Sequence, residues 1–290
     1  MVRRNIKDMR ILIGGSSSKI FHLKEFANSL EKIGITTKVV LDIDYSDGFP
    51  SKKIKHWLKP KNTFKKLIEE FKPDIILVIS PHAEKREGAF TINQQPKLKL
   101  DFKDFGDLVT NLEFDNEIGF GYQVKESCEE YFPIILTANE LLDYGSGVPL
   151  YFLARNLPGI KVINIGFSNL SNEDHIKFGE ILKEQINLSG KRVAVVASGD
   201  LSHKLHQDSP AGYSARGQEF DQRMMELLRD RKVEEIAKLD KELVKEAGEC
   251  GYRSLLILLG IMKNINYIPE KLSYQSPFGI GYLVENFKIG

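Results

Sequence analysis

Short apolar runs and helical patterns alternate along the chain. Near the N-terminus, two runs rich in β-branched residues occupy residues 10–14 (RILIG) and 36–43 (TTKVVLDI), and residues 20–33 between them follow a helical period that ends at Gly34. Two parallel strands joined through a helix need a right-handed crossover. Residues 10–43 therefore predict a β-α-β unit.

The same alternation continues to the C-terminus. It predicts buried strands at 73–80 (PDIILVIS), 160–168 and 191–200, a helix at 172–186 that begins near an Asn cap, a mostly helical stretch at 217–262, and a loop with a closing strand at 272–287. The chain contains no internal repeat and no obvious linker. The pattern predicts one α/β domain over residues 1–290, with helices on both faces of a largely parallel or mixed sheet.

Composition and charge narrow the classes of partner. With 42% hydrophobic residues and a net charge of +1, the chain has ordinary globular composition and no long-range field to hold nucleic acid or an anionic membrane. A basic stretch at 52–66, which includes His56, is interpreted as a solvated face. The start MVRRNIKDMR precedes no long apolar run, and Cys128 and Cys250 lie far apart. We predict a cytoplasmic protein with free thiols and small-molecule ligands.

Two predicted strands end in polar residues that are capable of chemistry. PDIILVISPH leads to His82, and VAVVASGDLSH leads to Ser198, Asp200, Ser202 and His203. In open α/β sheets, ligands bind beyond the carboxyl ends of the strands. These residues are candidates for a site, although hydrogen bonding within their own loops is an equally simple interpretation.

A third candidate lies in KEAGECGYRS, just before the apolar run LLILLG. Glu249 there would be costly to bury unless it is paired or bound to a cation, so it is a candidate metal ligand together with histidines from distant strands. An ordinary acid at a helix N-terminus is the competing interpretation, and Cys250 is by default a small buried residue. Of the remaining histidines, we expect His175 and His206 to be solvated, with His206 the better placed to line a pocket mouth.

Seven ordered segments resemble the class III extradiol dioxygenase superfamily, and within it the Memo-like domain of the AmmeMemoRadiSam system. They are PDIILVISPH, FKDFG, LLDYGSGVPLYFL, VAVVASGDLSH, EFD, EAGECGYRSLLILLG and SPFGIGYLVENF. The resemblance covers residues 73–290 and implies a fold like that of the B-type subunit of an extradiol dioxygenase. Residues 9–75 would then form an atypical N-terminal β-α-β section.

The resemblance also implies roles for individual residues. Catalytic members hold a non-haem Fe(II) with two histidines and one glutamate, which leaves positions for catechol and O2. His82 matches one iron ligand, Glu249 matches the carboxylate, and His203 matches the acid-base histidine that takes a proton from the substrate hydroxyl and returns one. Asp200 and Ser198 would position the loop and the imidazole.

The chain departs from the family pattern at two places. The other iron-ligand histidine of the family lies in a Pro-His-Pro-Pro type motif after the first strand, where this chain has GGSSSKIFHL, and His22 is the nearby histidine that would have to replace it. The family commonly has Asp-His-Gly where LLDYGSG carries Tyr144. Tyrosine can hydrogen-bond a substrate oxygen, but it cannot act as an imidazole near neutral pH.

The N-terminal segment carries a separate resemblance. Residues 9–75, with MRILIGGSSSKIFHL and a later EEFKPDII, resemble the opening of a GT-B glycosyltransferase. Glycine and serine after a first strand let a helix N-terminus approach a phosphate. Nucleotide-sugar binding at Gly14–Ser18 is therefore one functional hypothesis, although no second glycosyltransferase half follows.

The leading hypothesis is a non-haem Fe(II) dioxygenase-like protein that opens a catechol-type ring with O2, impaired by the missing iron histidine. The alternative is a non-catalytic, Memo-like metal-binding or modification-associated protein, in which Cys250 beside Glu249 would suit copper. Whether the chain is an active enzyme, and whether it binds any metal, stays open at this point. The expected partners are a small aromatic substrate and O2, without nucleic acid or membrane, and with a homo-oligomer or partner subunit possible.

Overall fold

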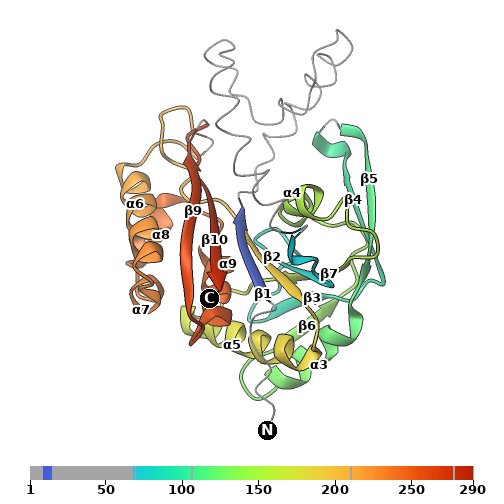
Figure 1. The fold of residues 1–290 in the computed structure, drawn as a ribbon. Helices are drawn as coiled ribbons and strands as arrows, with labels where there is room; N and C mark the ends of the chain where they lie inside the picture. The colour runs from blue at the N-terminus through green and yellow to red at the C-terminus, as the bar shows by residue number, and fades with distance from the viewer. Residues whose placement is uncertain are drawn as a thin grey trace.

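Four parallel strands form the centre of the fold (Figure 1). The computed structural model describes residues 9–14, 68, 70–105, 107–209, 211–276 and 278–289. The central strands are, in spatial order, β7 (Lys161–Gly166), β2 (Ile75–Ser80), β8 (Val193–Ser198) and β1 (Met9–Gly14). All four were predicted from apolar runs in the sequence, and all four are confirmed.

Antiparallel pairs extend this centre on both sides, so that the described sheet has ten strands and is mixed. On one side β7 is followed by β5 (Asp107–Asn116) and β4 (Lys97–Phe102), and on the other side β1 is followed by β10 (Tyr282–Ile289) and β9 (Tyr267–Gln275). β3 (Phe90–Asn93) pairs with β7 and with β6 (Ile134–Thr137). The predicted loop before the closing strand is in part β9, which the sequence analysis missed.

The central strands are apolar at nearly every position because both faces of the sheet are covered. Successive side chains of a strand point to opposite faces. In β2, Ile75, Leu77 and Ile79 enter one core cluster, while Ile76 and Val78 enter the other. This division explains why PDIILVIS carries no charge after Asp74, as expected for a strand that is buried on both faces.

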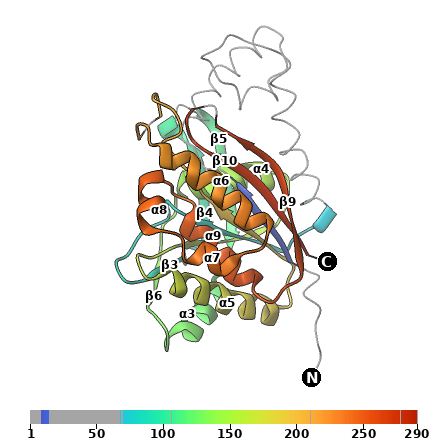
Figure 2. The same ribbon diagram turned by 90° about the vertical axis from the view of Figure 1, so that its left-hand side faces the viewer.

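Helices cover both faces, as predicted (Figure 2). One core cluster contains side chains of α3 (Ile118–Cys128), α5 (Asn172–Ser189), α6 (Ala215–Arg229), α7 (Val233–Ala237), α8 (Lys241–Ala247) and α9 (Tyr252–Met262). The other contains α4 (Tyr144–Leu153), and the short 3-10 helix η3 (Lys103–Phe105) follows β4 on that side. None of the helices in the described ranges is long and apolar enough to cross a membrane.

The packing of α5 against α9 depends on two glycines. A Cβ at Gly179 or at Gly260 would collide with the backbone of the opposite helix. The helix α5 begins at a capping box formed by Ser171 and Asp174, so the cap is one residue earlier than the predicted Asn cap. This close packing sets the position of α9, whose N-terminus carries part of the candidate site.

The expectation that His175 is solvated was wrong. Its side chain is fully buried in α5, and its ring nitrogens lie 2.7 Å from the carbonyl oxygen of Ser171 and 3.2 Å from that of Ser168. Burial lowers the pKa of His175. His175 is therefore a structural residue of the core, whereas His206 is exposed, as predicted.

Several predictions concern residues outside the described ranges. They are the helix at 20–33, the strand at 36–43, the basic stretch at 52–66, residues 15–18 of the nucleotide-sugar hypothesis, and the histidines His22 and His56. These remain predictions.

Candidate functional site

Two loops meet at the carboxyl edge of the central sheet. The backbone N–H of Gly251 donates to the carbonyl oxygen of Asp200 at 2.9 Å, and the N–H of His203 donates to that of Ala247 at 3.0 Å. Gly199 adopts φ +148°, and a Cβ there would collide with the backbone of Gly251. The loop after β8 is thus held directly against the segment that contains Glu249 and Cys250.

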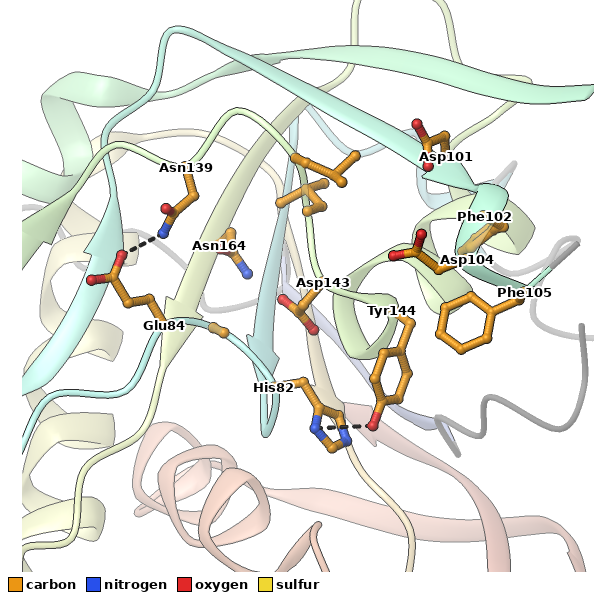
Figure 3. A pocket seen from close by; sticks show the side chains of 13 residues that line it. His82, Glu84, Asp101, Phe102, Asp104, Phe105, Asn139, Asp143, Tyr144 and Asn164 are labelled. Atoms are coloured by element: carbon orange, nitrogen blue, oxygen red, sulfur yellow. Dashed lines mark hydrogen bonds between the residues drawn. The ribbon is translucent and has the colours of Figure 1, made fainter. Parts of the chain in front are cut away.

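His82 and Tyr144 face each other at this edge (Figure 3). The Tyr144 hydroxyl lies 3.1 Å from His82 Nδ1, and the ring centres are 4.2 Å apart. Burial raises the pKa of Tyr144 to about 12, so the phenol is neutral near pH 7. Burial also lowers the pKa of His82, which favours the neutral imidazole, the form that binds metal ions. Tyr144 stands where the family commonly has a histidine, and here it is a hydrogen-bonding partner of His82.

Asp143 fixes the start of α4, and with it Tyr144. One carboxylate oxygen of Asp143 accepts from the Ser80 hydroxyl at 2.5 Å and from the Ser146 N–H at 3.0 Å, while the other accepts from the Ser146 hydroxyl at 2.8 Å. The Asn164 amide in turn donates to the Ser146 hydroxyl at 2.7 Å. Because Ser80 ends β2 and Asn164 lies within β7, the network ties the N-terminus of α4 to two neighbouring strands.

Ser198 acts on the same helix rather than on a histidine. Its hydroxyl donates to the carbonyl oxygen of Gly145 at 2.6 Å, at the end of β8. The resemblance assigned Ser198 to positioning the loop and the imidazole. The contact that the structure gives is with the backbone next to Tyr144.

Asp200, His203 and Cys250 lie together beside the meeting point of the loops. Their potential ligand atoms are all within 4.8 Å of one another. Nε2 of His203 is 3.4 Å from Asp200 Oδ2, is itself buried, and has no hydrogen-bond partner among the described residues. Burial raises the pKa of the Cys250 thiol, and the carboxylate of Asp200 raises it further. The cluster therefore holds an unsatisfied imidazole nitrogen and a protonated thiol.

Glu249 carries a carboxyl group in an unfavourable position for a free anion. Its Oε2 accepts a hydrogen bond from the Tyr252 N–H at 2.5 Å, at the first turn of α9. Burial nevertheless raises the pKa of Glu249 to about 7, although the charges of Arg253, His203 and Lys85 act to lower it. A bound cation would favour the ionised carboxylate. Both sequence interpretations of Glu249 are thus compatible with its position, since its carboxyl group accepts from a helix N-terminus and is also desolvated beside the loop of His203.

The donor groups at this edge are of the types that a divalent first-row metal ion takes. Neutral imidazole and carboxylate are the donors that non-haem Fe(II) sites use. His82 supplies a neutral imidazole, Glu249 supplies a desolvated carboxyl, and the buried Nε2 of His203 is without a hydrogen bond among the described residues. His22, the expected substitute for the second iron histidine, lies outside the described residues.

Two pockets of opposite charge adjoin these residues. The first, of about 500 Å³, is lined by His82 and Tyr144 and by four acids, and we call it the acidic pocket. Its acids are Glu84, Asp101, Asp104 and Asp143. The second, of about 840 Å³, is lined by Glu249 and by four basic residues, and we call it the basic pocket. Its basic residues are Lys238, Lys241, Lys245 and Arg253.

Sequence reasoning gave no role to Asp221, which supports the loop after β8. One oxygen of this fully buried carboxyl accepts from the Ser202 N–H at 2.8 Å, and the other accepts from the Tyr274 hydroxyl at 2.6 Å. Burial raises the pKa of Asp221 to about 6. The EFD segment was one of the matching segments and so pointed to Asp221, but the spacing of residues did not predict its partner on β9, Tyr274.

A mixed α/β sheet with histidines and carboxyl groups at the carboxyl ends of its central strands defines a class of small-molecule or metal site. Comparison with known proteins gives the family. Residues 46–285 match the model of the catalytic LigB subunit of aromatic ring-opening dioxygenase, so the chain belongs to this class III extradiol dioxygenase family. The expectation drawn from the seven segments is confirmed at this level.

Three relatives are similar to this chain over at least two thirds of its length. The chain is 31% identical over 246 residues to Protein CA_C1420 of Clostridium acetobutylicum, and the match covers 80% of the chain but only 52% of that protein. It is 30% identical over 253 residues to the 2-aminophenol 1,6-dioxygenase beta subunit of a Pseudomonas species, covering 77% of the chain and 80% of the relative. It is 27% identical to the 3,4-dihydroxyphenylacetate 2,3-dioxygenase of Escherichia coli, covering 68% and 76%. The chain thus spans about half the length of the Clostridium protein.

A solved structure supports the fold. The crystal structure of the uncharacterized protein JW3007 from Escherichia coli K12 matches with a TM-score of 0.63 and 15% identity, over 97% of this chain and all of that one. The expected likeness of residues 9–75 to a glycosyltransferase finds no support, because the family match already begins at residue 46. In addition, β1 pairs with β8 and β10 in the common sheet.

Proposed function

We propose that this protein is an Fe(II)-dependent extradiol dioxygenase that opens an aromatic ring carrying adjacent hydroxyl, or hydroxyl and amino, groups. Membership of the LigB family supports the reaction class. The observation that carries the proposal is that the charge of His203, whose Nε2 is buried and without a hydrogen bond among the described residues, acts on the pKa of both His82 and Glu249. When bound, Fe(II) would supply open coordination positions at which the substrate oxygens and O2 meet.

In this proposal His82 and Glu249 hold the metal ion, with His22 as the candidate third ligand. Tyr144 orients His82 through the hydrogen bond to Nδ1 and leaves Nε2 free as the ligand atom. The cation would also release the proton that burial retains on Glu249, so metal binding and deprotonation are coupled.

His203 is the proposed acid-base residue. Its Nε2 is buried and without a hydrogen bond among the described residues, so it can accept the proton of a substrate hydroxyl. The Asp200 carboxylate, 3.4 Å away, would stabilise the imidazolium that forms. Cys250 does not act as an anion in this step, because its thiol is protonated.

Anaerobic titration with Fe(II), followed by oxygen uptake with catechol and with 2-aminophenol, tests the proposal. We expect close to one equivalent of iron to bind, and a ring-opened product that absorbs in the visible or near-ultraviolet range. His82→Ala should lose iron binding, whereas His203→Ala should keep the iron and lose the product. Wild-type protein that binds no iron above background, or binds it without product from any ortho-substituted ring, would overturn the proposal.

A non-catalytic metal-binding role is the second candidate, and the cluster of Asp200, His203 and Cys250 favours it. A thiol, an imidazole and a carboxylate within 4.8 Å suit a softer ion such as copper. Titration with Cu(I) separates the two candidates, because Cys250→Ser should abolish copper binding but leave Fe(II) binding and ring opening intact if the dioxygenase proposal holds. The Memo-like subgroup and a partner subunit stay predictions.

A further inference from the structure

The basic pocket is larger than the acidic pocket, and positive charge predominates in its lining. Its volume of about 840 Å³ is of the size that holds a small organic ligand. Two acids line it, Glu173 on α5 and Glu249 before α9, whereas three of its four basic residues lie within residues 238–245. The two pockets have no lining residue in common. A ligand of the basic pocket therefore needs no contact with His82 or Tyr144.

The segment that carries α7 and α8 separates its charges between two sides. From Val233 to Ala247, all three lysines line the basic pocket, and Lys241 and Lys245 are four residues apart on α8. Three acids of the same segment contact α6, which lies beside these helices (Figure 2). These contacts are Asp240 with Arg216 at 2.8 Å, Glu235 with Arg223 at 2.9 Å, and Glu246 with the Ser214 hydroxyl at 3.2 Å. The acids that could neutralise the lysines are thus engaged on the side away from the pocket.

The basic side chains of the pocket have few partners of their own. In the described part of the chain, Lys238 and Lys241 form no ion pair, and the nearest carboxylate oxygen of Glu242 is 3.9 Å from Lys245 Nζ. The guanidinium carbon of Arg253 lies 5.8 Å from the ring centre of Phe167, a contact that leaves its N–H groups available as donors. Like charges gathered around one cavity repel one another, and an anion in the cavity relieves this repulsion.

Two helices also begin at this pocket. Residues 171–173 at the start of α5 and residues 252–253 at the start of α9 line it. A helix N-terminus carries partial positive charge and favours phosphate groups. Part of this charge is already met by the capping box of α5 and by Glu249, which accepts from the Tyr252 N–H. The helix ends therefore add to the effect of the four basic residues but do not replace them.

We infer that the basic pocket binds a small molecule that carries a phosphate group. A phosphate monoester carries a charge of about −1.5 to −2 near pH 7, and lysine binds it as a point charge. The phosphate would lie on the α8 side, where the lysines are. Leu170, Leu239 and Val244 give the pocket an apolar wall for the uncharged part of the ligand. The inference does not depend on ring opening, because it assigns a second ligand to a second pocket.

Calorimetric titration of the full chain with phenyl phosphate tests the inference, with phenyl sulfate as a ligand of similar shape and a single negative charge. We expect saturable binding of phenyl phosphate, about tenfold tighter than that of phenyl sulfate and weaker as the salt concentration rises. Lys241→Gln, Lys245→Gln and Arg253→Gln should each lower the affinity for phenyl phosphate about tenfold, as for a lost charge-assisted hydrogen bond.

The chain offers matched controls. Lys232→Gln removes an exposed lysine at the start of α7 that does not line the pocket. Arg155→Gln matches Arg253→Gln, since the Arg155 guanidinium carbon also lies over an aromatic ring, 4.4 Å from the centre of Tyr151. Both control variants should bind phenyl phosphate as wild type does. His82→Ala should do so as well, because His82 lines only the acidic pocket.

Each outcome decides for or against the phosphate site. Weaker binding in the three pocket variants, with unchanged controls, supports it. Wild-type protein that shows no saturable binding, or that binds phenyl sulfate equally well, overturns it. Equal weakening by Lys232→Gln or Arg155→Gln also overturns it, since the attraction would then be general. Loss of binding in His82→Ala would place the phosphate at the candidate metal site instead. Failure of ring opening leaves the expected binding unchanged, so the two proposals can fail separately.

Discussion

The acidic and the basic pockets differ in how their charges are balanced. On the acidic side, Asp143 accepts three hydrogen bonds, Glu84 pairs with Arg86 and accepts from Asn139, and Asp101 pairs with Lys103. On the basic side, Glu249 keeps a raised pKa, and the only ion pair of the lining lysines among the described residues joins Lys245 to Glu242 at 3.9 Å.

The difference indicates which parts of the site are complete without a ligand. Asp143 and its partners hold Tyr144 and His82 in one geometry before anything binds, which is how a rigid scaffold prepares a site. Glu249 instead keeps a raised pKa because it is desolvated, although the charges of Arg253 and Lys85 act to lower it. We therefore expect substitutions on the basic side to act on ligands, and substitutions on the acidic side to act also on stability.

The largest effect should come from Glu249→Gln. The amide keeps the size and the hydrogen bond to Tyr252 but removes the anion, so Fe(II) affinity should fall by at least about 100-fold, more than for loss of an outer partner of a ligand. Ring-opening activity should fall with it. Anaerobic iron titration and oxygen uptake provide the two measurements.

Glu246→Gln is the control, since Glu246 is an exposed acid three residues earlier that accepts a hydrogen bond from Ser214. It should leave iron binding and activity unchanged. If Glu249→Gln bound iron as tightly as wild type, Glu249 would be only a helix cap, and the contrast between the two pockets would lose its main support.

His203→Gln should have the next largest effect, on catalysis and not on metal binding. Loss of a general acid-base residue reduces kcat by about 10²- to 10⁴-fold. His206→Gln, three residues along the same loop and exposed, should leave kcat unchanged. Single-turnover rates with pre-bound iron give the measurement, and a parallel loss of iron in His203→Gln would reassign this residue as a ligand.

Much of the central fold could be predicted from sequence because burial on both faces leaves a plain signal. The strands β1, β2, β7 and β8 lie in runs that are mostly apolar, and the helix α5 has a clear period. The strands β4 and β5 gave no such signal, because β4 alternates charged and apolar residues and β5, its hairpin partner, leaves Leu108 and Val109 exposed. Their pairing depends on tertiary contacts that a local pattern does not contain.

The candidate site was predictable where a strand end fixes a residue, and less so where loops meet. His82 and Asp200 follow from the rule of carboxyl ends, and Glu249 from the cost of burying an acid. The contact between Gly199 and Gly251 brings the segments of Asp200 and Glu249 together, and it depends on the packing of α9.

Substitution of Asp221 tests whether this carboxyl group stabilises the loop that carries His203, as Asp143 stabilises the acidic pocket. Its folded pKa is about 6 against 3.8 for the ordinary carboxyl, so between these values the folded protein retains a proton that the unfolded chain has released. The free energy of unfolding should therefore fall, relative to Asp221→Asn, as pH rises from 4 to 6, by up to about 3 kcal/mol. Urea unfolding at several pH values measures this slope.

Asp240→Asn should give the opposite sign. Asp240 caps α8, and its hydrogen bond from Arg216 lowers its pKa, so its contribution is present above the ordinary pKa and is lost as pH falls through the lowered one. If the stability of the Asp221→Asn variant changed with pH in the same way as that of the wild type, Asp221 would not be the group that retains the proton.

The smallest effect is expected from two helix caps, one at the site and one away from it. Asp143 and Ser171 both accept a hydrogen bond from the backbone N–H three residues on, at the starts of α4 and α5. Replacing either with alanine should cost about 1 kcal/mol of unfolding free energy through the lost cap. Only Asp143→Ala should also lower kcat, by about tenfold, because Tyr144 and His82 lose their fixed position while the basic pocket is untouched. Equal kcat in the two variants would show that the acidic pocket stabilises the fold alone, and that catalysis depends on the basic side.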